Sequence, residues 1–305
     1  MAPAASPTRI VQPPDRQGVS AGNVWLPPGD WVDLAGFLSQ RFPWASEAQW
    51  RERIRSGLVL DAQGRPLAQD APYLSGQRIW YYRDIADEPV IPYTAQLLYR
   101  DEHLLVADKP HFLPVVPSGR FLQQTLLVRL RRELQLPFLA PLHRIDRGTA
   151  GLVMFSANKA SCERYLTLFA QRRVHKRYVA LAEYRPSLVL PLRRHTRIVK
   201  AQRFPRMCEA EGAPNAETWI ESCEPLGTYA RYRLRPVTGR QHQLRVHLAA
   251  LGLPIVNDAL YGNELAHGAA DDPERPLQLL AQSIAFTDPV TGAEREFHSQ
   301  RTLPG

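Results

Sequence analysis

The sequence predicts an α+β protein with a mixed, mainly antiparallel sheet, preceded by a small module of two helices and a short sheet. Three observations predict this class. Strand-like apolar runs follow one another along most of the chain, with only a few helical patterns between them. Short turns join some of these runs, as in hairpins. The run Tyr229–Leu234 alternates aromatic or apolar residues with arginines, as a half-solvated strand does.

The length of the chain indicates about two domains. It has 305 residues, of which 44% are hydrophobic and 22% charged, as in a folded soluble protein. Residues 1–28 are Pro/Gly-rich and lack periodicity, so we expect an extended tail. A small module should then occupy 29–86, a proline-bounded linker 89–92, and a larger domain 93–305.

In the small module, the first helix is predicted by apolar residues at helical spacing after Asp30, namely Trp31, Leu34, Leu38 and Phe42. Ser46 and Gln49 have the spacing of a capping box, which opens a second helix. A hairpin from Gly57 toward Leu67 and a strand over Ile79–Tyr82 complete the αα-β module.

In the larger domain, Leu97–Tyr99 and Leu104–Ala107 flank a polar tetrapeptide and predict a hairpin. The other predicted elements are a buried strand over 151–155, a helix capped by Asn158, strands over 177–182 and 229–234, and a helix over 241–251 that Gly252 ends.

The charge of the chain favours a polyanionic partner. Lys and Arg exceed Asp and Glu by 38 to 30, and only four of these cations are lysines. Arginine makes bidentate phosphate contacts and stacks on bases. The alternative is a solvated basic surface in an arginine-rich protein, since net charge concerns association and not a site.

The cysteines indicate a reducing compartment. Cys162, Cys208 and Cys223 have neither metal-ligand nor redox spacing, so we expect reduced thiols. The N-terminal residues lack the charged start and apolar run of a signal peptide, and no apolar run approaches the roughly 20 residues that span a bilayer. We therefore expect a cytoplasmic protein with no membrane partner.

The first segment with chemical potential is Leu142–Gly151, in which Asp146 lies between Arg144 and Arg147 just before a buried strand. A tight loop there would hold the carboxylate at the edge of the sheet, where catalytic groups are often placed. On the residues alone, an aspartate between arginines is more often a surface ion pair.

The second segment is Arg235–Leu248, in which a Thr-Gly turn feeds a helix whose first turns carry Arg240, His242 and Arg245. Such a helix start could hold a phosphate or pair with a carboxylate. His242 and His247 are five residues apart and do not share a helical face, so we expect packing or hydrogen bonds and no metal site.

The third segment is His175–Leu181, in which Lys176 and Tyr178 should point to the same face of a strand. A cation beside an aromatic ring suits a nucleotide, because stacking of a base contributes about 1–3 kcal/mol. The alternative is that Tyr178 is an ordinary half-buried sheet residue.

Together these segments resemble the RluA-type RNA pseudouridine synthases. That family has a His-Arg-Leu-Asp loop, then a Lys-x-Tyr strand, then a Thr-Gly-Arg-x-His-Gln helix that continues through Arg-Val-His. The resemblance extends over about 95–297. Its further matches are 101–106, Lys109-Pro110, 252–255 with Asp258 and Tyr261-Gly262, Leu279, Ala281, Asp288-Pro289 and Thr291-Gly292.

The resemblance implies an isomerase that converts uridine to pseudouridine in structured ribosomal or transfer RNA, as a monomer and without a cofactor or metal. It makes Asp146 the nucleophile, pairs Arg245 with that carboxylate and stacks Tyr178 on the flipped base. It places Arg144 in the space that the uridine leaves. The other implied RNA contacts are His143, Arg147, Lys176, Arg240 and His242. Loss of Arg245 should lower turnover more than stability.

The catalytic loop departs from the family pattern at three positions. Ile145 stands in place of the usual leucine, while Gly148 and Ala150 stand where aspartate and serine are typical. We expect these positions to shape the loop and to influence which uridine is reached.

Two other functions compete with this one. The module over 29–86 resembles a small RNA-binding domain shared with a ribosomal protein, whose basic residues are represented only by Arg51, Arg53 and Arg55. The leading alternative is a non-catalytic RNA-binding or ribosome-assembly protein that keeps the fold and the charge. Intact Asp146, Tyr178 and Arg245 argue against it, because binding alone needs no carboxylate facing a polyanion. A hydrolase of a nucleoside or phosphoester would need a paired acid or a metal cluster, and none lies near these motifs.

Overall fold

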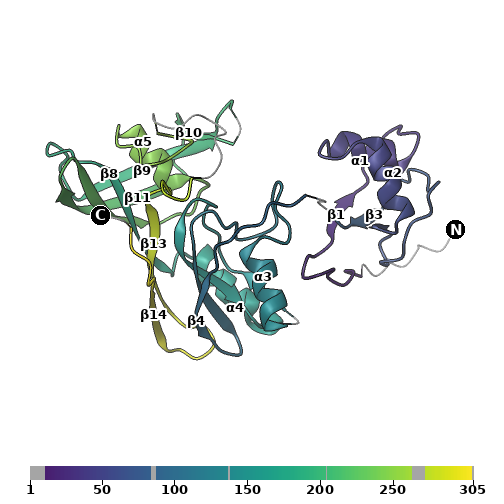
Figure 1. Ribbon diagram of the computed structural model, residues 1–305, viewed down its shortest axis with the longest axis horizontal. Helices are drawn as coiled ribbons and strands as arrows, with labels where there is room; N and C mark the ends of the chain where they lie inside the picture. Colours follow the sequence, from purple (N-terminus) through teal and green to yellow (C-terminus); the bar gives the residue numbers. More distant parts are fainter. Residues whose placement is uncertain (1–10, 84–86, 137, 204, 263–271, 304–305) are drawn as a thin grey trace. The chain divides into compact units, whose positions relative to one another are not determined.

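The computed structural model in Figure 1 describes residues 11–83, 87–136, 138–203, 205–262 and 272–303. The chain forms two compact units, Met1–Glu88 with Gly119–Gln123, and Pro89–Ser118 with Gln124–Gly305. Residues 1–10 of the expected tail, 84–86 of the expected module, and 137, 204, 263–271 and 304–305 of the expected larger domain lie outside the described residues. Within the described residues, no helix is long and apolar enough to cross a membrane.

The first unit contains the two predicted helices, α1 (Leu34–Arg41) and α2 (Glu47–Arg55). The predicted capping box of α2 forms, because the Ser46 hydroxyl accepts from the backbone N–H of Gln49 and the Gln49 side chain accepts from that of Ser46. Both helices contribute to a core around Trp50, which is fully buried.

The sheet of the first unit differs from prediction in two places. Its strand order is β1 (Gly22–Trp25), β3 (Arg78–Tyr81) and β2 (Val59–Leu60). β1 lies in the segment expected to be a tail, and its four alternating residues are too short a pattern to predict a strand. The arms of the hairpin expected from Gly57 toward Leu67 are joined by one bridge between Leu60 and Pro66 and by a backbone hydrogen bond from Leu67 to Val59 at 3.0 Å, but the second arm forms no strand.

The arginines of α2 make local contacts in this unit. Arg51 and Arg55 form ion pairs with nearby carboxylates, and the Arg53 guanidinium lies 5.3 Å from the centre of the Trp44 ring. Exposed ion pairs are worth only about 0–1 kcal/mol, so a phosphate could replace these partners. RNA binding by this unit stays a prediction.

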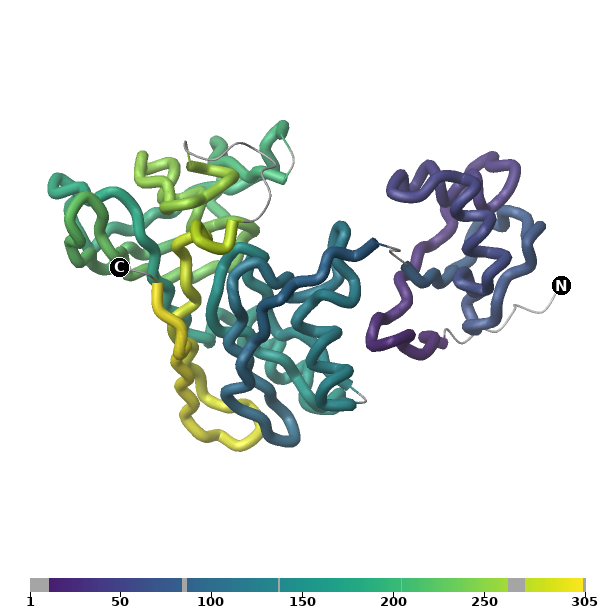
Figure 2. Tube along the Cα trace, in the orientation of Figure 1, coloured from purple at the N-terminus to yellow at the C-terminus, as the bar shows by residue number. Residues whose placement is uncertain are grey.

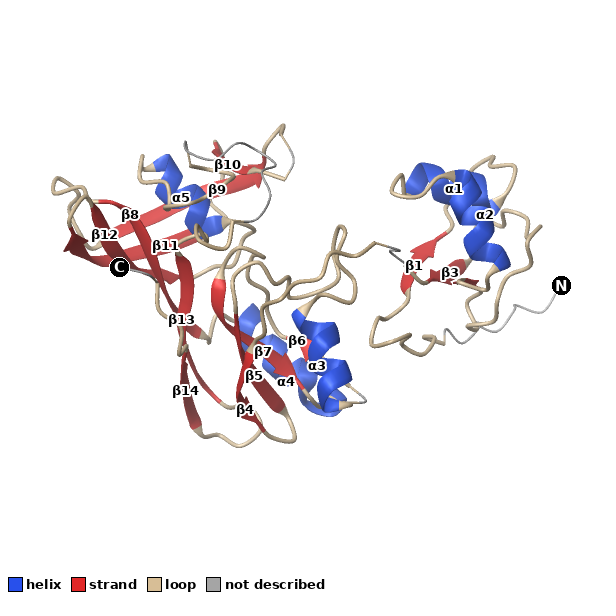
Figure 3. Ribbon diagram, in the orientation of Figure 1, coloured by secondary structure: helices blue, strands red, loops and turns tan. Residues whose placement is uncertain are grey.

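The second unit is built on one mixed sheet (Figure 3). Its strands are β4 (Gln96–Arg100), β5 (Leu104–Lys109), β6 (Ala140–Pro141), β7 (Ala150–Ser156), β8 (His175–Glu183), β9 (Leu192–Lys200), β10 (Met207–Ala210), β11 (Ala216–Leu226), β12 (Tyr229–Pro236), β13 (Leu279–Thr287) and β14 (Glu294–His298). The order is β10-β9-β11-β12-β8-β13-β7-β5-β4, with β14 beside β13 and β6 beside β7. Among the described strands, β13 and β7 pair in parallel and the other pairings are antiparallel, which confirms the predicted class.

The described helices of the second unit are α3 (Leu126–Leu134), α4 (Lys159–Ala170) and α5 (Gln243–Ala250). The hairpin β4–β5, the strands β7, β8 and β12, and the Asn158 cap of α4 confirm the prediction. α5 begins two residues later than predicted, because His242 takes a left-handed backbone conformation with φ of 56°. α3 and the strands β9, β10 and β11 have no counterpart among the predicted elements.

The register across β7, β13 and β8 brings the first and third chemical segments together. Gly151 of β7 pairs with Ala281 of β13, which pairs with Tyr178 of β8, and Figure 2 shows β13 running between the two halves of this sheet. Gly151 has φ of +108°, and a Cβ there would lie 2.2 Å from the Ala281 carbonyl oxygen. Only glycine permits this approach of the strands. The loop that carries Asp146 therefore enters β7 close to Tyr178.

Helix α5 is anchored to the sheet by its apolar residues. Leu244 and Leu248 are buried in one cluster with Ala180 of β8 and Tyr232 of β12. Burial of each leucine contributes about 1.5–3 kcal/mol. This packing fixes the position of Arg245, which directly follows Leu244.

Candidate active site

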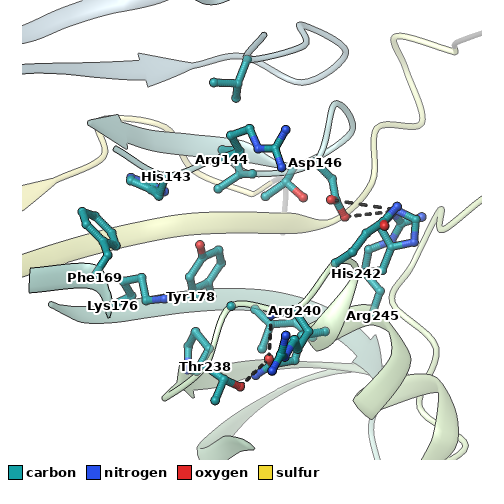
Figure 4. A pocket seen from close by; sticks show the side chains of 18 of the residues that line it. His143, Arg144, Asp146, Phe169, Lys176, Tyr178, Thr238, Arg240, His242 and Arg245 are labelled. Atoms are coloured by element: carbon teal, nitrogen blue, oxygen red, sulfur yellow. Dashed lines mark hydrogen bonds and ion pairs between the residues drawn. The ribbon is translucent and has the colours of Figure 1, made fainter. Parts of the chain in front are cut away.

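A cavity of about 920 Å³ lies in the second unit between the loop before β7, the first half of β8 and the loop that leads into α5 (Figure 4). Among its described lining residues, six side chains are cationic and one is a carboxylate: Arg144, Arg147, Arg172, Lys176, Arg240, Arg245 and Asp146. Such a lining attracts a polyanion. The Asp146 carboxylate repels an anion, so a role in binding the polyanion does not explain its presence.

Asp146 lies on the tight loop that the sequence predicts before the buried strand. Its backbone carbonyl accepts from the Thr149 N–H at 3.1 Å, which closes the turn. Its side chain is 26% exposed and can be reached from the cavity. Nη1 of Arg245 donates to Oδ2 of Asp146 at 3.0 Å, so the pairing that the resemblance implies is present.

Arg245 is held on its other side by Asp258. Nε and Nη2 donate to the two Asp258 oxygens, each at 2.7 Å, and the Asp258 carboxylate is fully buried. The backbone N–H groups of Leu260 and Tyr261 also donate to Asp258. Burial alone would lower the pKa of Arg245, but Asp258 and then Asp146 outweigh it and raise that pKa. Arg245 is therefore a permanently charged and rigidly aimed partner for Asp146.

Lys176 and Tyr178 both reach the cavity from the same face of β8, as the strand alternation predicts (Figure 4). Burial raises the pKa of the Tyr178 phenol, and the charge of Asp146 raises it further. The phenol therefore stays neutral. Burial lowers the pKa of Lys176 from its ordinary value.

The segment before α5 differs from the predicted helix start. Because α5 begins at Gln243, Arg240 and His242 lie in the preceding loop and not in the first helical turns. Nε of Arg240 donates to the Asn215 carbonyl at 3.0 Å. His242 lies with Nε2 3.9 Å from Oδ1 of Asp146. Burial lowers the pKa of His242 against the opposing charge of Asp146, so this contact pairs a neutral ring with a carboxylate.

Two further side chains at α5 hold the loop and the helix in place. The Gln243 side chain accepts from the Thr238 hydroxyl at 2.6 Å and donates to the Glu217 carbonyl at 2.8 Å, which ties the loop to β11. His247 is fully buried and hydrogen-bonds two threonine hydroxyls, so it packs as predicted. Among the described residues, no group of three or more His, Cys, Asp or Glu could hold a metal ion.

The other loop residues named from the sequence also line the cavity. Arg144 is exposed there. His143 accepts a backbone N–H of β7 at 3.2 Å and stacks on Phe169 with ring centres 5.1 Å apart. Burial, reinforced by the charge of Lys176, lowers the pKa of His143 to about 3, so the ring is neutral. These contacts give His143 a structural role in the loop.

Known proteins share both the sequence pattern and the fold of this chain. The model of a family described as RNA pseudouridylate synthase matches residues 103–250. The chain is 31% identical over 239 residues to an uncharacterized RNA pseudouridine synthase from Synechocystis. The matched region covers 75% of this chain and 79% of that protein. It is 34% identical over 212 residues to the dual-specificity RNA pseudouridine synthase RluA from Escherichia coli, over 66% of this chain and 90% of that protein. The chain belongs to the RluA-type RNA pseudouridine synthases.

This pseudouridine synthase is also similar to the solved structure of human RNA pseudouridylate synthase domain containing 1. The TM-score is 0.56 at 27% identity, over 70% of this chain and 86% of the human chain. The RNA pseudouridine synthase is an isomerase that acts on RNA, as the sequence predicts.

Sequence reasoning missed four side chains that support the site of this pseudouridine synthase: Lys109, Gln243, Asp258 and Tyr261. Lys109 is fully buried, and its Nζ donates to the Pro110 and Arg147 carbonyls at 2.8 and 3.2 Å. All four residues belong to segments that carry the family resemblance, so a signal for them was present. Each of the four also has a partner distant in sequence, and only the fold shows these contacts.

Proposed function

We propose that this enzyme isomerises uridine to pseudouridine with Asp146 as its nucleophile. One observation carries the proposal: a lone carboxylate, held by Arg245, faces a cavity whose other charged side chains, among the described lining residues, are all cationic. The reaction breaks the bond between ribose C1′ and uracil N1, rotates the base and rejoins it through C5. A carboxylate can attack the electron-poor centre of either the sugar or the base, and a fixed ion pair keeps it charged and aimed.

Tyr178 would stack on the flipped uracil. Its ring reaches the cavity from β8, and its raised pKa disfavours a role as a base at neutral pH. Stacking of a base on an aromatic ring contributes about 1–3 kcal/mol, which offsets part of the free energy of unstacking. Lys176 on the same face would then contact a phosphate together with Arg147 and Arg240.

The substrate would be a structured ribosomal or transfer RNA, bound by a monomer in the cytoplasm. The free thiols of all three cysteines support a reducing compartment.

The proposed reaction is tested with RNA labelled with tritium at C5 of uridine. Joining C5 to C1′ displaces the C5 hydrogen, so we expect tritium release into water from cellular RNA. Separate incubations with ribosomal and transfer RNA identify the substrate class. A protein that binds both RNAs tightly and releases no tritium from either would be the non-catalytic RNA-binding alternative.

Arg144→Ala should slow the reaction about tenfold on structured RNA and much less on a short unstructured oligonucleotide. The side chain is exposed at the cavity two residues before Asp146, where it can fill the space of the departing uridine. Extrusion of a stacked base costs a few kcal/mol, and tenfold corresponds to about 1.4 kcal/mol of that cost. Single-turnover tritium release on the two RNAs measures the difference.

The matched control is Arg100→Ala, which removes an exposed arginine that does not line the cavity. It should leave both rates unchanged. Equal rates for Arg144→Ala and wild type on structured RNA would remove the base-flipping role.

A further inference from the structure

The two oxygens of the Asp146 carboxylate have different neighbours. Oδ2 accepts from Arg245 at 3.0 Å, and Oδ1 faces Nε2 of His242 at 3.9 Å. The His242 side chain is only 9% exposed, so few orientations are open to it. Figure 4 shows His242 and Arg245 approaching Asp146 from the same side of the cavity.

The contacts of the Tyr261 hydroxyl favour one tautomer of the His242 ring. The Tyr261 hydroxyl oxygen accepts from the Met207 backbone N–H at 2.8 Å, which leaves the hydroxyl proton to be donated. Its other neighbour is Nδ1 of His242 at 2.9 Å. A neutral imidazole that accepts at Nδ1 carries its proton on Nε2, and Nε2 is the atom that faces Asp146.

The backbone of His242 is adapted to this orientation. Its φ of 56° is in the left-handed region, which is strained for a residue other than glycine. This conformation does not serve to cap α5, because the His242 side chain makes no capping hydrogen bond to the helix. It turns the ring instead toward Asp146 and Tyr261. Strain of this kind is common at functional sites.

We propose that His242, oriented by Tyr261, is a positioning residue that donates from Nε2 to Oδ1 of Asp146 when RNA is bound. This inference rests on the proposed role of Asp146 as nucleophile. The distance of 3.9 Å is longer than a hydrogen bond, and such contacts often shorten only in the substrate complex. With Arg245 on one oxygen and His242 on the other, the carboxylate cannot rotate. A neutral donor orients Asp146 without cancelling its charge, and His242 keeps its proton throughout.

The test is a double-mutant cycle with His242→Ala and Tyr261→Phe, measured as single-turnover tritium release from RNA bound at saturation. His242→Ala should lower the rate constant about 10- to 100-fold, because a misplaced reacting group of this kind can cost about 100-fold. Its Kd for RNA should stay within about twofold. Tyr261→Phe keeps the ring beside Arg245 and removes the hydroxyl, so it should lower the rate about 3- to 10-fold. Because Tyr261 acts through His242, the double variant should be no slower than His242→Ala alone.

The matched control is His247→Gln, on the same helix, fully buried and hydrogen-bonded but not facing Asp146. It should lower the melting temperature with little effect on the rate constant, whereas His242→Ala should do the reverse. Wild-type rates in His242→Ala, with Asp146→Asn inactive, would refute this inference and leave the nucleophile in place. If the rate reductions of His242→Ala and Tyr261→Phe multiply in the double variant, Tyr261 does not act through His242. An active Asp146→Asn would instead overturn the proposed function itself.

Discussion

Arg245→Met should destabilise the protein by about 3–5 kcal/mol and also lower turnover about 100-fold or more. Removal of one partner of a buried ion pair leaves the other charge uncompensated, and here that charge is the fully buried Asp258. Turnover falls because Asp146 loses the donor that aims it. Urea unfolding gives the loss of stability, and tritium release at a temperature where the variant is folded gives the rate.

The double variant Arg245→Met/Asp258→Asn separates these two effects. Because residue 258 no longer carries an unpaired buried charge, the double variant should recover at least half of the lost stability. Its turnover should remain as slow as that of Arg245→Met. Full activity in the refolded double variant would show that Arg245 serves the fold alone. The resemblance implies that loss of Arg245 lowers turnover more than stability. Because Asp258 is fully buried, we expect a large loss of stability as well.

The fold could be predicted from the sequence where the pattern is local. The capping box of α2, the Asn158 cap and the alternation of β12 each depend on neighbours in sequence, and each is confirmed. β1 could not be predicted because four alternating residues carry too little signal without their partner β3. The register that aligns Gly151 with Tyr178 depends on β13, more than 100 residues later in the chain than either.

The residues of the site that the family motif names could be predicted from the sequence. The residues whose role depends on contacts in the folded protein could not. The pairing of Arg245 with Asp146 follows from the family motif and is present. The start of α5 was placed too early because the left-handed conformation of His242 has no local signature such as glycine. Asp258 and Tyr261 act on groups that precede them by more than ten residues, so the sequence alone does not indicate what they hold.

Asp146→Asn should lower the rate of pseudouridine formation about 10⁴-fold or more while the protein stays folded and still binds RNA. The amide matches the carboxylate in shape but is no nucleophile, and losses of this size follow removal of a catalytic carboxylate. Stability should change by only about 1 kcal/mol, because Arg245 keeps its two bonds to Asp258. Affinity for RNA should be equal or higher, since the substitution removes the only negative charge among the described lining residues of the cavity.

Asp101→Asn is the matched control. The Asp101 side chain is 28% exposed against 26% for Asp146, and an arginine also lies near it, but it does not line the cavity. It should react at the wild-type rate.

The most direct measurement is single-turnover release of C5 tritium by wild type, Asp101→Asn and Asp146→Asn, with binding of the same RNA measured on each protein. We predict equal rates for the first two proteins, and tight binding without release for Asp146→Asn. Release by Asp146→Asn at a rate near that of wild type would contradict the assignment of Asp146 as the nucleophile.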